Sequence, residues 1–254
     1  FLSKKSFIIL THKMWQNKRI ISIIPARSGS TRLKNKNILP IGGIPMIGWA
    51  IQNSLSIKEI DTTIVTTDDK NIAKIARDHG AKTPFLRSAK LSKSSSAFTP
   101  VILDALQRVK SEFGVFDYAV ILQANSPLTA RGDIRRVIFE AIRQKRDVVF
   151  SVTRLSSPPQ WTLRLKGKKP EFAFRDVSQA QNYQRQQLEH LYRSSGAVYC
   201  ANINYLKNNP DSAQLALPAN GQNSAVIATD PMNAIDVDTE LDYILAEAIY
   251  ARKS

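Results

Sequence analysis

A cationic loop directly follows an apolar segment near the start of the chain. Residues 20–25 (IISIIP) are almost entirely apolar, and residues 26–37 (ARSGSTRLKNKN) then combine hydroxyl side chains with four cations. Arg and Lys side chains match the oxygens of phosphate groups, and Gly29 lets the backbone approach a ligand closely. The composition alone fits a phosphate site or a solvated basic loop. Neither G-x-x-x-x-G-K-[ST] nor G-x-G-x-x-G occurs, which disfavours an ATPase or a standard Rossmann dehydrogenase.

A pair of carboxylates near the end of the chain forms the second candidate site. Asp236 and Asp238 lie in the segment IDVDT. Side chains of an extended backbone repeat every two residues, so both carboxylates can face one cation. Hard oxygen ligands suit Mg²⁺, which also takes substrate phosphates as ligands. Taken alone, a D-x-D pair is more often a turn or a helix cap than a metal site.

Apolar and amphipathic segments alternate along most of the chain. This alternation predicts an α/β fold, with a mostly parallel sheet covered by helices on both faces. The C-terminal helix begins near Thr239, which can cap it together with Asp242. Strands are predicted at 21–26, 61–69, 117–124, 147–153, 194–206 and in the segment SAVIAT, and helices at 45–55, 71–81, 98–113, 131–145 and after Thr239.

Charge, cysteine content and the basic first residues indicate the cellular compartment in which we expect the protein. The chain has 254 residues, a formal charge of +15 and one cysteine, Cys200, which we expect in the core. Residues 1–19 hold five cations and no acid, and we interpret them as a loose basic extension. Its apolar stretch SFIIL is too short for a bilayer span, so we expect no membrane association. A single cysteine favours a reducing compartment, and we expect a cytoplasmic protein.

The order of the motifs points to a known family. The loop IPARSGSTRLKNKN, followed by IVTTDD, FLRSAKLS, ILQANSPLT, QRQQLEHLYRSSGAVY and IDVDTELD, resembles the CMP-sugar synthetases of the acylneuraminate cytidylyltransferase family. The resemblance covers the chain from about residue 20 to its C-terminus. It implies a Rossmann-like nucleotidyltransferase domain at 20–154 and 194–254. Residues 155–193, rich in Pro, Gln and aromatic residues, would be an inserted dimerisation arm of a homodimer.

The resemblance also implies a reaction. The anomeric hydroxyl of a nonulosonic acid would attack the α-phosphorus of CTP and expel pyrophosphate. The protein would position the reactants and stabilise charge. The resemblance assigns nucleotide contacts to Arg27, Ser30, Lys36, Asn37, Arg87 and Ser96, sugar contacts to Gln123, Arg185, Tyr192 and Arg193, Mg²⁺ binding to Asp236 and Asp238, and catalytic roles to Arg27, Lys36, Asp236 and Asp238.

Several alternatives and departures from the family pattern stay open. Asn37 could be a turn residue, and the segment RQQLEHLYR could be an amphipathic helix with solvated arginines. Ser94, the pair Ala124-Asn125 and Trp161 replace the family's usual Asp, Pro-Thr and Lys. Asp68 and Asp69 are expected to cap a helix more than to bind metal, and a role in the site stays open because they lie at a strand end. A Kdo-type enzyme acting on an eight-carbon acid, and a nucleic-acid-binding protein that uses its positive charge, are the competing functions; we expect no specific nucleic-acid partner.

Overall fold

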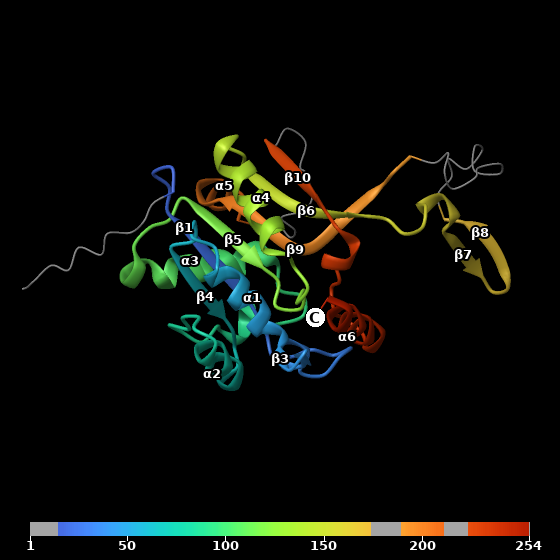
Figure 1. Ribbon diagram of the computed structural model, residues 1–254, viewed down its shortest axis with the longest axis horizontal. Coiled ribbons are helices and arrows are strands. Elements are labelled where there is room, and N and C mark those ends of the chain that lie inside the picture. Colours follow the sequence, from blue (N-terminus) through green and yellow to red (C-terminus); the bar gives the residue numbers. More distant parts are fainter. Residues whose placement is uncertain (1–14, 174–188, 211–222, 254) are drawn as a thin grey trace, which may run out of the picture.

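The central feature of the fold is one six-stranded sheet. The structure is a computed structural model that describes residues 15–173, 189–210 and 223–253. The strands lie in the order β10-β6-β9-β5-β1-β4 (Figure 1). Their bounds are β1 Ile20–Pro25, β4 Thr62–Thr66, β5 Tyr118–Leu122, β6 Val148–Arg154, β9 Tyr192–Asn202 and β10 Ser224–Thr229.

The predicted mostly parallel sheet is confirmed, with one exception among the strands of this sheet. β9 runs antiparallel to both of its neighbours, β5 and β6. The reason lies in the connection, because the chain leaves the sheet at the end of β6 and returns beside it, with Arg154 paired to Tyr192. A parallel return would need a crossover to the opposite end of the sheet.

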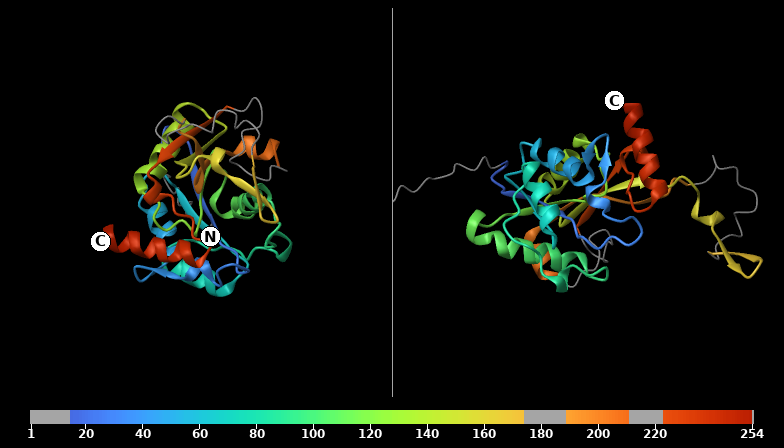
Figure 2. Two further views of the ribbon diagram at one scale, coloured as in Figure 1. Left: turned by 90° about the vertical axis from the view of Figure 1, so that its right-hand side faces the viewer. Right: turned by 90° about the horizontal axis from the view of Figure 1, so that it is seen from below.

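Helices cover both faces of the sheet, as the alternation predicts (Figure 2). On β1, Ile20 and Ile24 face one side and Ile21 and Ile23 the other, and all four are fully buried. The first face packs against helices α1 (Met46–Leu55), α2 (Lys70–Asp78) and α4 (Arg131–Arg143), and the second against α3 (Phe98–Phe113) and α5 (Ile203–Asn208). Burial on both faces explains why the strands are apolar without alternating with polar residues.

A smaller apolar cluster anchors the C-terminal segment. Helix α6 (Glu240–Lys253) packs near the short strands β2 (Pro40–Ile41) and β3 (Ile44–Pro45). Buried Val237 and Ala246 meet Ile41 and Met46 in this cluster. The predicted cap of α6 is present: the Asp242 carboxylate accepts from the backbone N–H of Thr239 at 2.8 Å, and Thr239 Oγ1 accepts from Asp242 N at 3.3 Å.

The described part of the segment inserted between β6 and β9 projects from the body. It contains a hairpin of β7 (Leu163–Lys166) and β8 (Lys169–Phe172), which stands clear of the sheet in Figure 1 and in the right-hand view of Figure 2. All eight residues of these two strands are exposed. The prediction that this segment is a dimerisation arm concerns a partner chain and stays a prediction.

Three local expectations need correction. The strand predicted over 194–206 ends at Asn202, whose side chain accepts from Asn204 N and caps α5. The segment RQQLEHLYR is not helical where it is described, because Tyr192 and Arg193 belong to β9. The last residues of the supposed loose extension are packed on the body, where Trp15 stacks on Phe139.

Cys200 is fully buried in the core, as expected. Burial raises the pKa of its thiol, so it stays protonated and unreactive. Within the described residues, no helix combines the length and apolar character needed to cross a membrane.

Candidate functional site

A pocket opens at the carboxyl ends of β1 and β5, where the strand order reverses. The chain passes from β1 to β4 on one side and then to β5 on the other, and ligands bind at such switch points in open α/β sheets. The pocket is lined by residues of four segments: Pro25, Arg27, Lys36 and Asn37; Arg87, Leu91, Lys93, Ser94 and Ser96; Phe98 and Val101; Gln123 and Asn125. The structure thus brings together six of the predicted site residues, which are Arg27, Lys36, Asn37, Arg87, Ser96 and Gln123.

The charge of this pocket is one-sided. Four cationic side chains line it, and none of its lining residues is acidic. Arg87 is 5% exposed, and burial together with the nearby charge of Arg27 lowers its pKa, while Asp68 opposes this effect. Two like charges held this close, one of them buried, favour an anion between them. The pocket is therefore suited to a polyphosphate.

Asp68 ties the loop to the wall of the pocket. Its carboxylate accepts from Ser28 N at 3.0 Å and from Ser28 Oγ at 2.7 Å, and its Oδ1 lies 3.9 Å from Arg87 Nη2. Burial alone would raise the pKa of Asp68, but the hydrogen bonds from Ser28 and the charge of Arg87 outweigh it and lower that pKa. The expectation that Asp68 caps a helix is wrong. Asp69 does so, accepting from Ile72 N at 2.8 Å.

Asn37 closes the loop from its other end. It is 6% exposed, and its Nδ2 donates to the backbone carbonyl of Arg27 at 3.0 Å. This bond spans the loop, so Asn37 is not a turn residue that bonds its own backbone. Lys36 and Asn37 lie on a 3-10 turn, Lys36–Ile38, that follows Asn35 in the left-handed conformation. The short turn directs the Lys36 ammonium toward the second half of the site.

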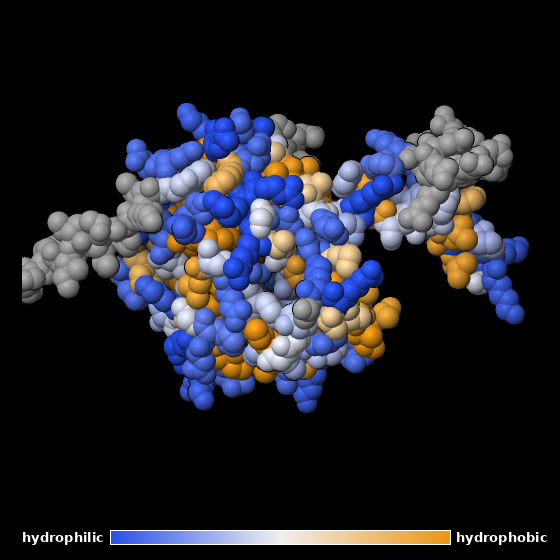
Figure 3. Space-filling view, viewed as in Figure 1, coloured by the Kyte–Doolittle hydropathy of each residue, from blue (hydrophilic) through white to orange (hydrophobic). Residues whose placement is uncertain are grey.

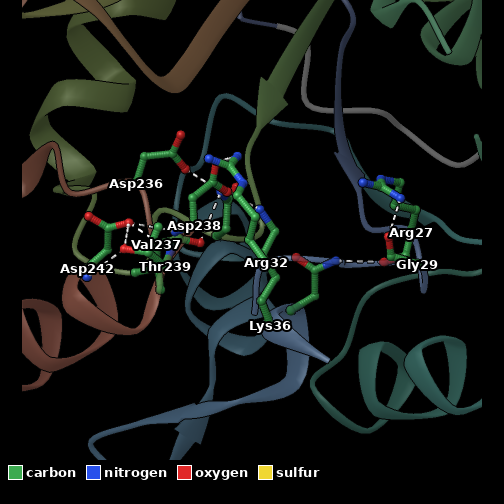
Figure 4. Close-up of polar contacts among 11 residues, drawn as sticks. Arg27, Gly29, Arg32, Lys36, Asp236, Val237, Asp238, Thr239 and Asp242 are labelled. Atoms are coloured by element: carbon green, nitrogen blue, oxygen red, sulfur yellow. Dashed lines mark hydrogen bonds and ion pairs between the residues drawn. The ribbon is translucent and has the colours of Figure 1, made fainter. Parts of the chain in front are cut away.

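That second half is the carboxylate pair (Figure 4). Asp238 accepts from both Lys36 Nζ and Arg32 Nη2. Asn125 Nδ2 donates to Asp236 Oδ1 and, at 3.2 Å, to Asp238 Oδ1. Both carboxylates therefore face one place, as the D-x-D spacing predicts, although residues 234–238 form no strand.

The electrostatics of the pair fit a cation. Burial, followed by the charge of Asp238, raises the pKa of Asp236 to about 6, while Lys36 and Arg193 act to lower it. A carboxylate destabilised in this way gains from a neighbouring positive charge. The described residues contain no group of three or more His, Cys, Asp or Glu side chains that could hold a metal ion. A cation here would therefore complete its shell with other oxygens, which is typical of Mg²⁺.

A bulge in β9 brings the strand close to this pair. The register of β6 and β9 shifts between Phe150 and Val152, and Gly196 in this region has a φ of 76°. A Cβ atom at Gly196 would lie 3.5 Å from Asp236 Oδ2. The left-handed backbone favours glycine at the position, whereas a Cβ atom there would make only an ordinary van der Waals contact with Asp236.

The other predicted nucleotide- and sugar-binding residues that the structure describes do not line the pocket. Ser30 lines no part of it, and its N–H donates to Ser28 O at 2.7 Å. Tyr192 is half exposed at the base of the arm, and Arg185 lies outside the described residues. Arg193 is exposed, but its charge acts on Asp236 of the same chain. The predicted contact of Arg193 with the sugar stays a prediction.

Sequence reasoning left three residues without their roles at this site. Arg32 was identified only as one cation of a basic loop, Asp68 as a helix cap, and Asn125 as a departure from a family pattern. Each acts across the fold, since Asn125 meets Asp236 at a separation of 111 residues. The available signal was that Asp68 lies at the end of the strand predicted over 61–69 and Asn125 directly after the strand predicted over 117–124.

The comparisons with known proteins agree with this geometry. Residues 21–209 match the family model described as cytidylyltransferase. The chain belongs to the cytidylyltransferase family. It is 27% identical over 235 residues to a pseudaminic acid cytidylyltransferase of Campylobacter jejuni, covering 91% of this chain and 95% of the relative. It is 29% identical over 236 residues to a CMP-N,N'-diacetyllegionaminic acid synthase of Legionella pneumophila, covering 91% and 96%.

A solved structure shares the fold of this cytidylyltransferase. A CMP:2-keto-3-deoxy-manno-octonic acid synthetase complexed with CTP matches with a TM-score of 0.66 and 18% identity, covering 93% of this chain and 100% of the other. The family resemblance predicted from the six motifs is confirmed, and so is a Rossmann-like nucleotidyltransferase fold. The chain is a nucleotidyltransferase, which excludes the interpretation as a non-catalytic nucleic-acid-binding protein.

Replacing Asp68 by Ala should weaken CTP binding by about tenfold, because the phosphate loop and Arg87 lose the carboxylate that holds them together. Asp69→Ala is the matched control: it should lower the free energy of unfolding by about 1 kcal/mol through the lost cap, with CTP affinity unchanged. Calorimetric titration with CTP and urea unfolding measure both effects. Equal CTP affinities for the two variants would contradict the role given to Asp68.

Asp236→Asn should make the ligand-free, EDTA-treated protein more stable at pH 7.5. A folded pKa of about 6, above the usual value, means that Asp236 costs stability as pH rises from about 4 to about 6. An amide cannot ionise, so the variant should gain up to about 3 kcal/mol at pH 7.5 and nothing below pH 4. Urea unfolding at the two pH values measures this difference. A gain independent of pH, or no gain, would show that Asp236 is not destabilised by its charge.

Proposed function

We propose that this cytidylyltransferase transfers CMP from CTP to the anomeric hydroxyl of a nonulosonic acid and releases pyrophosphate. The observation that carries the proposal is the junction of two sites of opposite charge. A pocket lined by cations and lacking acids meets a carboxylate pair. Lys36 and Asn125 line the pocket and also donate hydrogen bonds to the carboxylate pair. Relatives at 27% and 29% identity are named as enzymes for pseudaminic and diacetyllegionaminic acid, which supports a nine-carbon acid sugar as acceptor.

The first task of the site is to hold the triphosphate. Arg27, Lys36 and Arg87 would neutralise its oxygens and stabilise the charge that develops on the leaving pyrophosphate. The backbone and side chains of the loop at Ser94 and Ser96, which also lines the pocket, would meet the cytosine. Asn37 fixes the loop, and its contact with the nucleotide stays a prediction, as does the contact of Ser30.

The second task is to place the acceptor hydroxyl in line with the α-phosphorus. As the new bond from the anomeric oxygen to the α-phosphorus forms, the bond from that phosphorus to the bridging oxygen of pyrophosphate breaks. The hydroxyl proton passes to solvent water in the same step. Gln123, on the pocket wall, and the exposed Arg193 would orient the sugar and its carboxylate. Arg185 and Tyr192 remain predicted sugar contacts.

Asp236 and Asp238 would hold Mg²⁺ as the cofactor. The raised pKa of Asp236 and the convergence of both carboxylates on one amide nitrogen support this assignment. When bound, such an ion supplies positive charge to the phosphate oxygens. When no metal ion is bound, Arg32 and Lys36 neutralise Asp238. When a metal ion takes their place beside Asp238, the two side chains become available to phosphates.

The main alternative is an eight-carbon acceptor of the Kdo type. The CMP:2-keto-3-deoxy-manno-octonic acid synthetase shares the fold at 18% identity, which supports the architecture but not the acceptor. The named relatives at higher identity favour the nine-carbon acids.

Incubating the protein with CTP, Mg²⁺ and a panel of acid sugars should release pyrophosphate with at least one nonulosonic acid. ATP should replace CTP poorly, because the pocket wall at 91–96 is expected to select the base. Lys36→Ala should lower turnover by about ten- to a hundredfold through the loss of a charged contact to the phosphates. Release with the eight-carbon acid alone would move the assignment to the alternative. Equal use of all four nucleotides would contradict base selection.

We also propose that the enzyme is cytoplasmic and that it is a homodimer. The arm would form the dimer interface. On the hairpin, Leu163 pairs with Phe172 and Leu165 with Pro170, so four apolar residues share one face. Leu163, Leu165 and Phe172 are 50%, 68% and 49% exposed. Figure 3 shows this hydrophobic group on the hairpin, set apart from the body. An exposed apolar group of this kind marks an interaction surface.

Leu165→Asp should shift the protein from dimer to monomer and leave the melting temperature of the body nearly unchanged, because the hairpin contributes nothing to the core. Arg164→Asp, on the opposite face of the same strand, is the control and should leave the dimer intact. Sedimentation velocity across a range of concentrations measures both. A wild-type monomer, or a dimer in both variants, would refute the role of the hairpin face.

A further inference from the structure

Asn125 is the residue that joins the carboxylate pair to the sheet. It follows β5 at the rim of the nucleotide pocket and is 8% exposed. Its Nδ2 donates to Asp236 Oδ1 and Asp238 Oδ1, and lies 3.5 Å from Val237 O. Within the described residues, Asn125 is the only hydrogen-bond donor to the Asp236 carboxylate, whereas Asp238 also has Lys36 and Arg32.

Sharing one donor brings the two carboxylates close. Each of two oxygens lies within hydrogen-bond reach of the same nitrogen, so they cannot be more than about 6 Å apart, twice the length of a hydrogen bond. Two carboxylates at that distance repel each other in a partly buried site. The amide supplies partial positive charge between them, which offsets the repulsion when no cation is present.

The backbone of Asn125 has a separate structural role. Its carbonyl accepts from Val237 N at 2.8 Å, and Val237 is fully buried in the cluster under α6. This contact fixes the segment that carries both aspartates, whatever the side chain at position 125. A substitution there therefore changes the interaction with the carboxylates and retains the backbone attachment.

We infer that Asn125 is a positioning residue whose side-chain amide preassembles Asp236 and Asp238 into a single divalent-cation site before substrate binds. The inference rests on the proposed cation site and adds a residue of this chain to it. Hydrogen-bonding partners of metal ligands typically contribute about ten- to a hundredfold to metal affinity. The number of charged ligands contributes as well, so a carboxylate at this position has the opposite effect from an apolar side chain.

The test is Mn²⁺ binding to the nucleotide-free protein, followed by the paramagnetic resonance signal of free Mn²⁺. Asn125→Ala should weaken binding about ten- to a hundredfold, because the carboxylates are free to separate. Asn125→Asp should tighten it by about threefold or more, because a third oxygen ligand of the same shape replaces the donor. In EDTA, Asn125→Asp should have a lower melting temperature than Asn125→Ala. Addition of Mn²⁺ should raise the melting temperature of Asn125→Asp more than that of Asn125→Ala.

Asn53→Ala provides the matched control. Asn53 is also 8% exposed, and its Nδ2 donates to the backbone carbonyl of Thr129 at 2.8 Å, away from the pair. This variant should lose stability and bind Mn²⁺ as the wild type does. A purely structural role for Asn125 would make its two variants behave like Asn53→Ala.

The possible outcomes distinguish a failure of the inference about Asn125 from a failure of the proposed cation site or of the proposed function. If wild type and Asp236→Asn bind Mn²⁺ equally, the cation site is wrong and the inference is overturned with it. If Asp236→Asn loses binding while both Asn125 variants retain wild-type affinity, or both weaken alike, the inference alone is overturned. Cytidylyl transfer, measured separately with Mg²⁺ and CTP, decides the proposed function.

Discussion

A single backbone hydrogen bond connects the two halves of this site. Val237 N donates to the carbonyl of Asn125 at 2.8 Å, and through it the segment before α6 is held at the carboxyl end of β5. The cations come from the loop after β1 and the acids from a segment about 200 residues later in the chain. The side-chain contacts of Asp238 with Lys36 and Arg32 join the same two parts of the molecule.

Opposite charges also hold the site together when no substrate is present. Asp238 accepts from Lys36 and Arg32, and Asp68 holds Ser28 close to Arg87. Partly exposed ion pairs such as these contribute little to stability, so they can exchange partners at small cost. A polyanion with its counter-ion offers each of these side chains an equivalent partner. The site is thus organised in advance, and binding needs a redistribution of contacts more than a change of fold.

Much of the fold was predictable from the sequence, because apolar periodicity reports burial directly. The runs at 20–25 and 118–122 lie in the middle of the sheet, and α1, α3 and α4 appear where the patterns place them. The reversed direction of β9 was not predictable, since it depends on where the arm returns. The switch to α5 was missed because an apolar run does not distinguish a strand from a short buried helix; the cap at Asn202 was the signal.

At the site, residue types indicated phosphate and cation chemistry, but the partners of Asp68 and Asn125 depend on tertiary contacts that no local pattern contains.

The continuity of β6 and β9 into the arm has a consequence for how this chain can vary. The two strands pair from the core out to Arg154 and Tyr192, and Arg193 and Gly196 lie on the core side of that last pair. Residues beyond the pair can be inserted or deleted without altering the ladder. A one-residue slip within 193–196 would instead turn Arg193 to the other face of the sheet and remove its charge from Asp236. The last pair of the ladder therefore separates the arm, whose length does not set the register of β6 and β9, from residues 193–196, whose register keeps the charge of Arg193 near Asp236.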